Sequence, residues 1–475
     1  MLNRELLALL EEWERRESSR LFPDDGPCRR ELYPKHLEFF RLGATKAIRA
    51  FIAANRVGKS TAACFELSCH LTGDYPHWWE GRRFDGPIEA WAASLSWKDN
   101  RDGIQTKLFG REGEPGTGII PSWAVDPARI TFIPSTNGAI DKAMVRHVSG
   151  GWSELGMKAY EQGRDKFQAL SRHVILLDEE PEKFGIFSES ITRTATVNGI
   201  VMLSFTSLKG VTPLVMKFLP ELGKPLEEGD EEEDRSHLAA VICGWADVPH
   251  IPKAMQEVLL SGYSEHEKKA RTTGWPGLSA GMVYPVEENE FIVQPFDIPK
   301  HWPRVFALDP GWARTAAVWI AYDRENDVAY LYSEYYRGQA EPEIHARAIL
   351  ARGDWIPGVS DNAVDIKNGK SVIDAYKALG IKKLKPAKKS GKDVRLMATH
   401  SRLSTGRFKV FSTCQWWLWE FRQYKTDEAG EIASEHDHLM NATEYAVESG
   451  LPIAELPAPP MPKHTMQEQT FGIHG

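Results

Sequence analysis

The sequence has few cysteines and no pattern that would use them structurally. Their number is odd, and no two of them form a Cys-x-x-Cys pair. They are Cys28, Cys64, Cys69, Cys243 and Cys414. This usage is typical of free thiols in a reducing compartment, and it excludes a structural zinc site built on paired cysteines.

Long apolar runs and a basic surplus are also lacking. No stretch of about 18 apolar residues occurs, so we expect no membrane-spanning helix. Residues 1–20 mix acidic and basic side chains without the apolar core of a signal peptide. Because the net charge is −8, any nucleic-acid contact must come from local patches. The length of 475 residues is enough for two or three domains.

Segment 53–61, Ala-Ala-Asn-Arg-Val-Gly-Lys-Ser-Thr, predicts a phosphate-binding loop of the Walker A type. An apolar, strand-like run precedes it and a helical pattern follows it. In such a loop, backbone N–H groups and the helix N-terminus bind phosphates, Lys59 reaches the β- and γ-oxygens, and Ser60 ligates Mg²⁺. The full pattern has a glycine five residues before Gly58, where this chain has Ala53, so the match is degenerate.

A second stretch supports an ATPase and predicts the Walker B position. The apolar residues 174–177 favour a buried strand, and Asp178 and Glu179 follow at its C-terminal end, where open α/β sheets bind ligands. We expect Asp178 to hold Mg²⁺ through water and Glu179 to polarise the attacking water. The alternative is a solvated acidic turn closed by Pro181. The predicted ATP-binding residues are Asn55, Arg56, Val57, Gly58, Lys59, Ser60, Thr61 and Asp178, with Ser60 and Asp178 on the metal and Glu179 as the catalytic carboxylate.

The segment ahead of the loop is a candidate adenine contact. In many helicase-like ATPases this location contacts the base, so Tyr33 or His36 could stack on it. An amphipathic helix that packs Leu37 and Phe40 into the core explains the same residues equally well.

A candidate coupling element follows the acidic strand end. Residues 201–207 form an apolar strand that ends in hydroxyl side chains. In helicase-like motors a Ser/Thr motif at this place senses the γ-phosphate, which makes Thr206 the candidate here. A simple turn at the end of a strand is the alternative.

The C-terminal half predicts a nuclease of the ribonuclease H type. Strands come first, with Asp309 at the end of the first strand and a hairpin signal at residues 323–327, and helices follow. Such sites bind two divalent ions through carboxylates from distant positions, which stabilise the attacking and leaving oxygens. Asp361, with Asp365 as its rival, is the second candidate ligand, and Asp437 at the start of a helix is the third.

A lysine-rich segment is the best candidate for contact with a phosphate backbone. Its residues are Lys382, Lys383, Lys385, Lys388 and Lys389, followed by Lys392, Arg395, Arg402, Arg407 and Lys409. A solvated loop is the alternative. Trp416, Trp417 and Trp419 could stack on bases, but their helical spacing favours core packing.

The composition of the chain predicts five segments. Residues 1–30 form an N-terminal helical segment, 31–245 the P-loop ATPase domain with a mainly parallel sheet, and 246–300 a linker. Residues 301–450 form a ribonuclease H-like domain with a mixed sheet, and 451–475 an extended proline-rich tail.

Taken in this order, the motifs resemble the large terminase subunit of tailed bacteriophages. The resemblance covers residues 30–450 and rests on the Arg-x-Gly-Lys-Ser loop, the Asp-Glu-Glu-Pro strand end, the Ser/Thr motif and the three carboxylates. Segment 437–446 is similar to a frequent Asp-His-x-x-Asp-Ala-x-x-Tyr-Ala ending, with Asn441 where the family often has Asp.

The resemblance implies a motor that uses ATP and Mg²⁺ to move double-stranded DNA into a procapsid. It also implies a nuclease, with two Mg²⁺ or Mn²⁺ on Asp309, Asp361 and Asp437, that cuts concatemeric DNA. Arg56 is the candidate for an arginine that triggers hydrolysis. The implied partners are the portal protein, a small terminase subunit and further copies in a ring on the portal, with a monomer in solution as the alternative state, in the host cytoplasm and without a membrane.

Two other functions compete with this interpretation. A cellular helicase-nuclease of repair or defence would share the ATPase, but would normally need a second motor domain. A binding protein with both sites inactive would explain Ala53 and Asn441, yet Lys59, Asp178 and Glu179 are intact.

Overall fold

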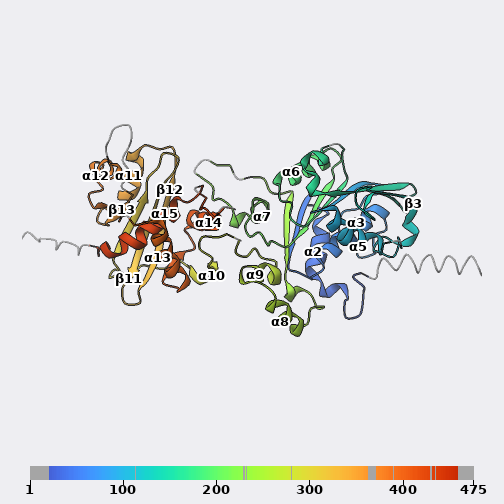
Figure 1. Cartoon of the computed structure of the whole chain (residues 1–475), viewed down its shortest axis with the longest axis horizontal. Coiled ribbons are helices and arrows are strands. Elements are labelled where there is room, and N and C mark those ends of the chain that lie inside the picture. The colour runs from blue at the N-terminus through green and yellow to red at the C-terminus, as the bar shows by residue number, and fades with distance from the viewer. Residues whose placement is uncertain are drawn as a thin grey trace, which may run out of the picture. The chain divides into compact units, whose positions relative to one another are not determined.

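The computed structural model describes residues 21–457 except 113, 169, 228–229, 232, 280, 362–370, 389, 428–429 and 434. The chain divides into two compact units, Met1–Ala280 and Gly281–Gly475, and each is described by itself (Figure 1). Within the described ranges no helix is long and apolar enough to cross a membrane.

The first unit is built on an eight-stranded sheet with the order β3-β4-β5-β2-β6-β7-β1-β8. Its strands are β1 Ile48–Ala53, β2 Glu89–Ser94, β3 Val125–Phe132, β4 Ile140–Arg146, β5 Trp152–Ala159, β6 Val174–Asp178, β7 Ile200–Phe205 and β8 Leu238–Cys243. From β5 to β8 all neighbours are parallel, while β3 and β4 extend the sheet as an antiparallel hairpin. The mainly parallel sheet predicted from the sequence is confirmed.

Helices cover both faces of this sheet. They are α2 Pro34–Leu42, α3 Lys59–Thr72, α4 Trp97–Asn100, α5 Thr106–Phe109, α6 Phe184–Ala195, α7 Pro213–Phe218, α8 Lys253–Ser261 and α9 Glu265–Thr273. Along β6, Leu176 packs with the apolar residues of α2, α3 and α5, while Ile175 and Leu177 pack with those of α6 and α7. The strand is therefore buried on both faces, which explains its unbroken apolar sequence.

The first unit also includes residues 246–279, which the sequence predicted to be part of a linker. Val248 and Ile251 are buried in the same core as the phosphate loop, and Ala270 of α9 is buried too. These apolar residues are spaced among prolines, glycines and histidines, so the local composition conceals that they belong to a core.

The second unit has a seven-stranded mixed sheet with the order β14-β13-β10-β11-β12-β15-β9. Its strands are β9 Ile292–Val293, β10 Arg304–Asp309, β11 Thr315–Asp323, β12 Val328–Arg337, β13 Gly358–Ser360, β14 Leu384–Pro386 and β15 Phe408–Phe411. Only the β10-β11 and β11-β12 pairs are antiparallel, so the predicted mixed sheet is confirmed. The unit begins before residue 301, because β9 pairs with β15, and Leu451–Ile453 forms a short 3₁₀ turn where the tail was predicted.

The helices of this unit lie on the two faces of its sheet. They are α10 Glu288–Phe291, α11 Pro342–Leu350, α12 Val372–Ala378, α13 Lys392–Ser404, α14 Gln415–Gln423 and α15 His438–Tyr445. Helices α13, α14 and α15 share one core, and α11 and α12 share the other. Trp417 and Trp419 of α14 are buried, which confirms core packing for them, and Trp416 is half-buried.

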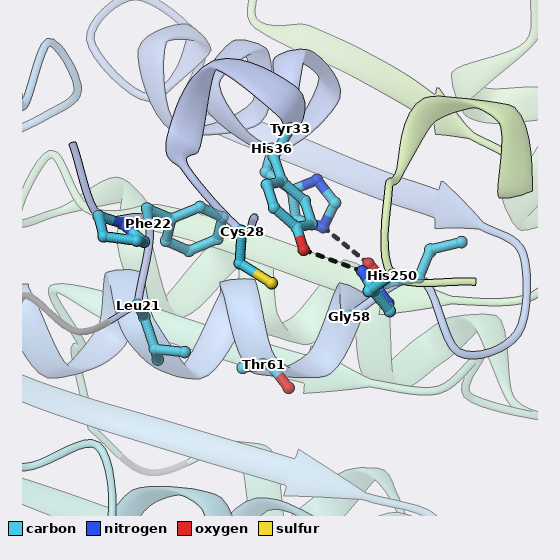
Figure 2. Close-up of a pocket in the computed structure, with 10 residues that line it drawn as sticks. Leu21, Phe22, Cys28, Tyr33, His36, Gly58, Thr61 and His250 are labelled. Atoms are coloured by element: carbon cyan, nitrogen blue, oxygen red, sulfur yellow. Dashed lines mark hydrogen bonds between the residues drawn. The ribbon is translucent and has the colours of Figure 1, made fainter. Parts of the chain in front are cut away.

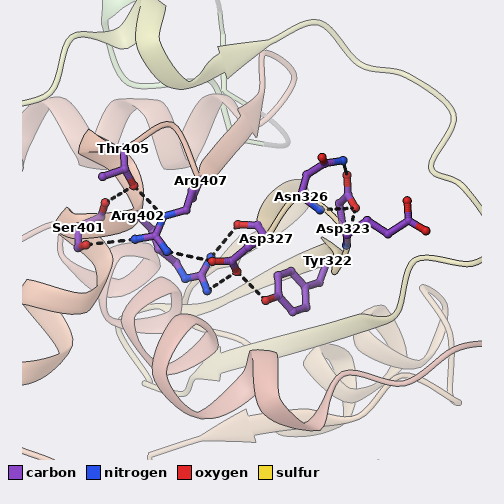
Figure 3. A network of polar contacts seen from close by, with 9 residues as sticks. Tyr322, Asp323, Asn326, Asp327, Ser401, Arg402, Thr405 and Arg407 are labelled. Carbon is purple, nitrogen blue, oxygen red and sulfur yellow. Dashed lines mark hydrogen bonds and ion pairs between the residues drawn. The ribbon is translucent and has the colours of Figure 1, made fainter.

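The hairpin predicted at residues 323–327 joins β11 and β12 and is fixed by a carboxylate (Figure 3). Asp327 accepts hydrogen bonds from the Tyr322 hydroxyl at 2.6 Å, from Arg402 at 2.8 Å and from Arg407 at 2.9 Å. The first two contacts contribute most to lowering the pKa of Asp327 to about 2. Arg402 and Arg407, which the sequence placed in a phosphate-binding cluster, are thus engaged in an internal network.

Candidate functional site

The phosphate loop joins β1 to α3 and presents unpaired backbone donors. Gly58 has a φ of 91°, in the left-handed region that favours glycine, and α3 begins at the next residue. In the described structure, no backbone or side-chain acceptor receives a hydrogen bond from the N–H groups of residues 56–61. Several unpaired N–H groups at the start of a 14-residue helix form an anion-binding site.

The acidic strand end lies next to this loop. The Lys59 ammonium is 3.5 Å from a carboxylate oxygen of Glu179. Asp178, at the end of β6, is buried and accepts a hydrogen bond from the Ser204 hydroxyl on the neighbouring strand β7. Lys59 and the two acids, which are far apart in sequence, therefore face one site.

Glu179 has a strained backbone that several contacts hold in place. Its φ is 64°, which is uncommon for a residue with a side chain. Its N–H donates to the Ser204 carbonyl at 2.8 Å, and the Tyr160 hydroxyl lies 3.0 Å from its carbonyl oxygen. Partial burial raises the pKa of Glu179, and the Lys59 ammonium opposes that rise. Strain of this kind is typical of functional sites.

Thr206 connects the two halves of the site. Its hydroxyl lies 2.7 Å from the Ala53 carbonyl oxygen and 3.1 Å from Asn55 Oδ1, both at the start of the phosphate loop. The backbone of Thr206 also lowers the pKa of Glu179, so it lies near that carboxylate. A movement of either partner therefore reaches the end of β7, although the coupling role of Thr206 stays a prediction.

A pocket of about 260 Å³ opens beside the loop (Figure 2). Its lining residues are Leu21, Phe22, Pro23, Cys28, Tyr33, His36, Val57, Gly58, Thr61 and His250. The rings of Tyr33 and His250 stack with centroids 5.7 Å apart, and their side chains share a 3.0 Å hydrogen bond. His36 is buried between other rings, and burial lowers its pKa to about 4. Phe40 is buried in the core, as expected if α2 is an amphipathic helix that packs against the sheet.

In the second unit, the predicted nuclease acids gather at the end of β10. Asp309 ends β10, and Asp361 follows β13, the parallel neighbour of β10. Asp437 is the N-cap residue of α15, and the next residue, His438, places Nδ1 3.0 Å from Asp309 Oδ2. The sequence prediction gave His438 no role, although it directly follows Asp437.

The negative charges of these acids act on one another and affect the pKa of Asp309. Burial raises the pKa of Asp309, the His438 contact opposes this, and the charges of Asp437 and Asp361 add to it. Carboxylate oxygens are ligands that a hard divalent cation prefers, and a bound cation would offset the repulsion between these acids. Within the described ranges, no group of three or more His, Cys, Asp or Glu side chains is spaced to hold a metal ion. Asp365 lies in 362–370, outside the described residues.

The predicted DNA-contacting lysines differ in their surroundings. Lys382, Lys385 and Lys388 are exposed, while Lys383 pairs with Glu455 at 2.5 Å. Lys389 lies outside the described residues.

Comparison with known proteins decides the family. The N-terminal model of the large terminase subunit, T4likevirus type, matches residues 50–291, and a terminase ribonuclease H-like model matches residues 306–449. The chain belongs to the large terminase subunit family. It is therefore a DNA-packaging protein that hydrolyses ATP and cleaves DNA.

Two curated relatives and two solved structures are similar to this terminase chain. The large terminase subunit of Salmonella phage P22 is 29% identical, with 93% of this chain and 90% of the relative covered. That of Enterobacteria phage LP7 is 27% identical over 55% of this chain and 54% of the relative. A large terminase from a thermophilic bacteriophage, in complex with ADP, has a TM-score of 0.40 at 14% identity, covering 89% of this chain and 99% of that one. The P22 nuclease domain has a TM-score of 0.35 at 24% identity, covering 37% and 95%.

Proposed function

We propose that the first unit of this terminase subunit binds Mg²⁺-ATP between the phosphate loop and the end of β6. The observation that carries the proposal is the 3.5 Å contact between Lys59 and Glu179, beside backbone N–H groups that have no acceptor in the described structure. Lys59 would bind the β- and γ-phosphates, and Ser60 and Asp178 would hold Mg²⁺. The ion, when bound, neutralises charge on the phosphate oxygens.

Hydrolysis then depends on side chains that the fold has already placed. The ionised Glu179 carboxylate orients the attacking water, and Lys59 leaves it to bind the nucleotide. Thr206 transmits the loss of γ-phosphate, since it contacts both the loop and Glu179. Arg56 remains the proposed arginine for charge in the transition state. The pocket beside Tyr33 and His250 takes the adenine by stacking.

In the second unit, Asp309, Asp361 and Asp437 would hold two Mg²⁺ or Mn²⁺ ions. Such ions stabilise the attacking and leaving oxygens of a phosphodiester. His438 orients Asp309 through the 3.0 Å contact. Lys382, Lys383, Lys385, Lys388 and Lys389 are the proposed contacts to the DNA backbone.

The proposed assembly is a ring of this subunit on the portal protein of the procapsid. A small terminase subunit would select the viral genome, and the work would take place in the host cytoplasm. Terminase models match both halves of the chain, which favours this assembly over a cellular helicase-nuclease.

The test separates nucleotide binding from turnover. Glu179→Gln should lower kcat for ATP by about 10²-fold or more while leaving ADP affinity unchanged, because only the water loses its partner. Lys59→Ala should lower the affinity itself. Normal turnover in the purified Glu179→Gln variant would overturn the assignment of the catalytic carboxylate.

A further inference from the structure

Three successive carbonyl groups of the phosphate loop each meet a side-chain N–H donor from outside the loop. Trp245 Nε1 donates to the Asn55 oxygen at 2.8 Å, and His250 Nε2 lies 2.8 Å from the Arg56 oxygen. His36 Nε2 lies 2.9 Å from the Val57 oxygen. Because a carbonyl oxygen can only accept, both histidines must carry hydrogen on Nε2.

These contacts fix the directions of the loop's own donors. In a trans peptide the C=O and the N–H of one unit are rigidly held on opposite sides of the C–N bond, and the described chain has no cis peptide bond. Pinning the carbonyls of residues 55, 56 and 57 therefore orients the N–H groups of residues 56, 57 and 58. These three belong to the set that meets no acceptor in the described structure. The carbonyls point to donors of the protein, and the N–H groups on the opposite side of each peptide unit stay available to an anion.

The middle residue of the loop needs such support. Arg56 has a φ of 67°, and this left-handed conformation is unfavourable for a residue with a side chain. His250 supports it from behind, because its Nδ1 lies 3.0 Å from the Tyr33 hydroxyl, which leaves Nε2 to donate to Arg56. His36 is buried, and its low pKa of about 4 keeps it neutral.

We infer that Trp245, His250 and His36 are positioning residues that pre-organise the phosphate loop for its anionic ligand. The inference rests on the proposed phosphate site at Lys59 and explains how that site is held ready. Two of the three donors lie in residues 245–250, just after β8. A ligand that changes the conformation of the loop should therefore also change this segment.

The test compares two tryptophans that differ in which carbonyl they bind. Trp245 and Trp79 are both 5% exposed in the same core, and Trp79 Nε1 donates to the Arg82 carbonyl at 2.9 Å, away from the loop. Trp245→Phe should weaken the binding of inorganic pyrophosphate and ADP by about tenfold, the value of one well-formed hydrogen bond. Trp79→Phe should lower the melting temperature similarly but leave both affinities unchanged.

A second pair checks the role of the donor itself. His250→Gln retains an N–H donor and should retain most of the pyrophosphate affinity, whereas His250→Leu should lose about tenfold; pyrophosphate is the probe because it has no base to stack on residue 250. Hydrogen exchange adds a measurement that is independent of activity, because ADP should slow exchange in residues 245–250 of the wild type.

The outcomes separate this inference from the phosphate site. If the wild type binds pyrophosphate, Lys59→Ala does not, and Trp245→Phe binds like Trp79→Phe, then the positioning role is refuted while the site stands. If Lys59→Ala binds pyrophosphate as tightly as the wild type, the phosphate site is misassigned and the positioning role is refuted with it.

Discussion

Replacing Tyr160 by Phe should slow ATP hydrolysis without weakening ATP binding. The Tyr160 hydroxyl is buried and lies 3.1 Å from the Asp178 carbonyl and 3.0 Å from the Glu179 carbonyl. The substitution removes only this hydroxyl, and the ring stays to fill its place in the core. In the part of the chain that the structure describes, the hydrogen bonds of this hydroxyl go to these two carbonyls and not to Lys59 or the phosphate loop.

The size of the expected effect on kcat follows from the carbonyl groups that lose their donor and from the backbone strain at Glu179. A buried carbonyl that loses its donor costs about 1–3 kcal/mol, and the left-handed φ of 64° adds about 1–2 kcal/mol in favour of relaxation. If misplacement of the Glu179 carboxylate raises the activation free energy of hydrolysis by about 1.4 kcal/mol, kcat falls about tenfold. KM for ATP should stay within about twofold.

Steady-state ATPase assays on Tyr160→Phe, with Tyr75→Phe as the matched control, measure this effect. The Tyr75 hydroxyl also has two partners in the same unit, His70 Nδ1 at 3.0 Å and the Phe84 N–H at 2.9 Å, but it lies away from Glu179. The control should lose stability and keep kcat. An unchanged kcat in folded Tyr160→Phe, or a higher KM with the same kcat, would refute the reasoning.

Three further predictions concern charge. Asp327→Asn should destabilise the second unit by about 1 kcal/mol after solvent screening. Since the pKa of Asp327 is lowered from 3.8 to about 2, urea unfolding should show this difference in full above pH 4 and lose it as the pH falls through about 2. Lys385→Ala with Lys388→Ala should reduce the salt dependence of plasmid binding by about one unit of log–log slope per lysine, with DNA-independent ATPase unchanged; an unaltered slope would remove them from the DNA contact. Because the pKa of Glu179 is raised above its usual 4.5 and the ionised form is needed, kcat should decline with falling pH at values above 4.5, and a flat profile down to that pH in a folded enzyme would contradict the role.

The sequence was sufficient where a local pattern carried the information. Apolar residues 174–177, ended by Asp178, predict a strand buried on both faces, and β6 is such a strand. The hairpin at 323–327 was equally clear, because two strand-like runs rich in apolar and aromatic residues flank a polar turn. The two-domain α/β architecture and the family followed from the order of these local signals.

Contacts between residues far apart in the chain could not be predicted from the sequence. Trp245 and His250 follow β8 in a segment rich in Pro, Gly and His, and only the folded chain brings them against the phosphate loop. Tyr160 likewise reaches the acidic strand end from another strand's terminus. The contacts of Arg402 and Arg407 with Asp327 were not predicted, because that partner is more than 70 residues away in the chain.

The central claim is that one chain carries two independent sites, at Glu179 and at Asp309. Plasmid cleavage with Mg²⁺ or Mn²⁺ and ATP hydrolysis should be measured in the same samples of wild type and Asp309→Asn. We expect metal-dependent cleavage in the wild type, its loss in the variant, and equal ATP hydrolysis in both. Loss of both activities in a folded variant, or cleavage that survives the substitution, would contradict the account.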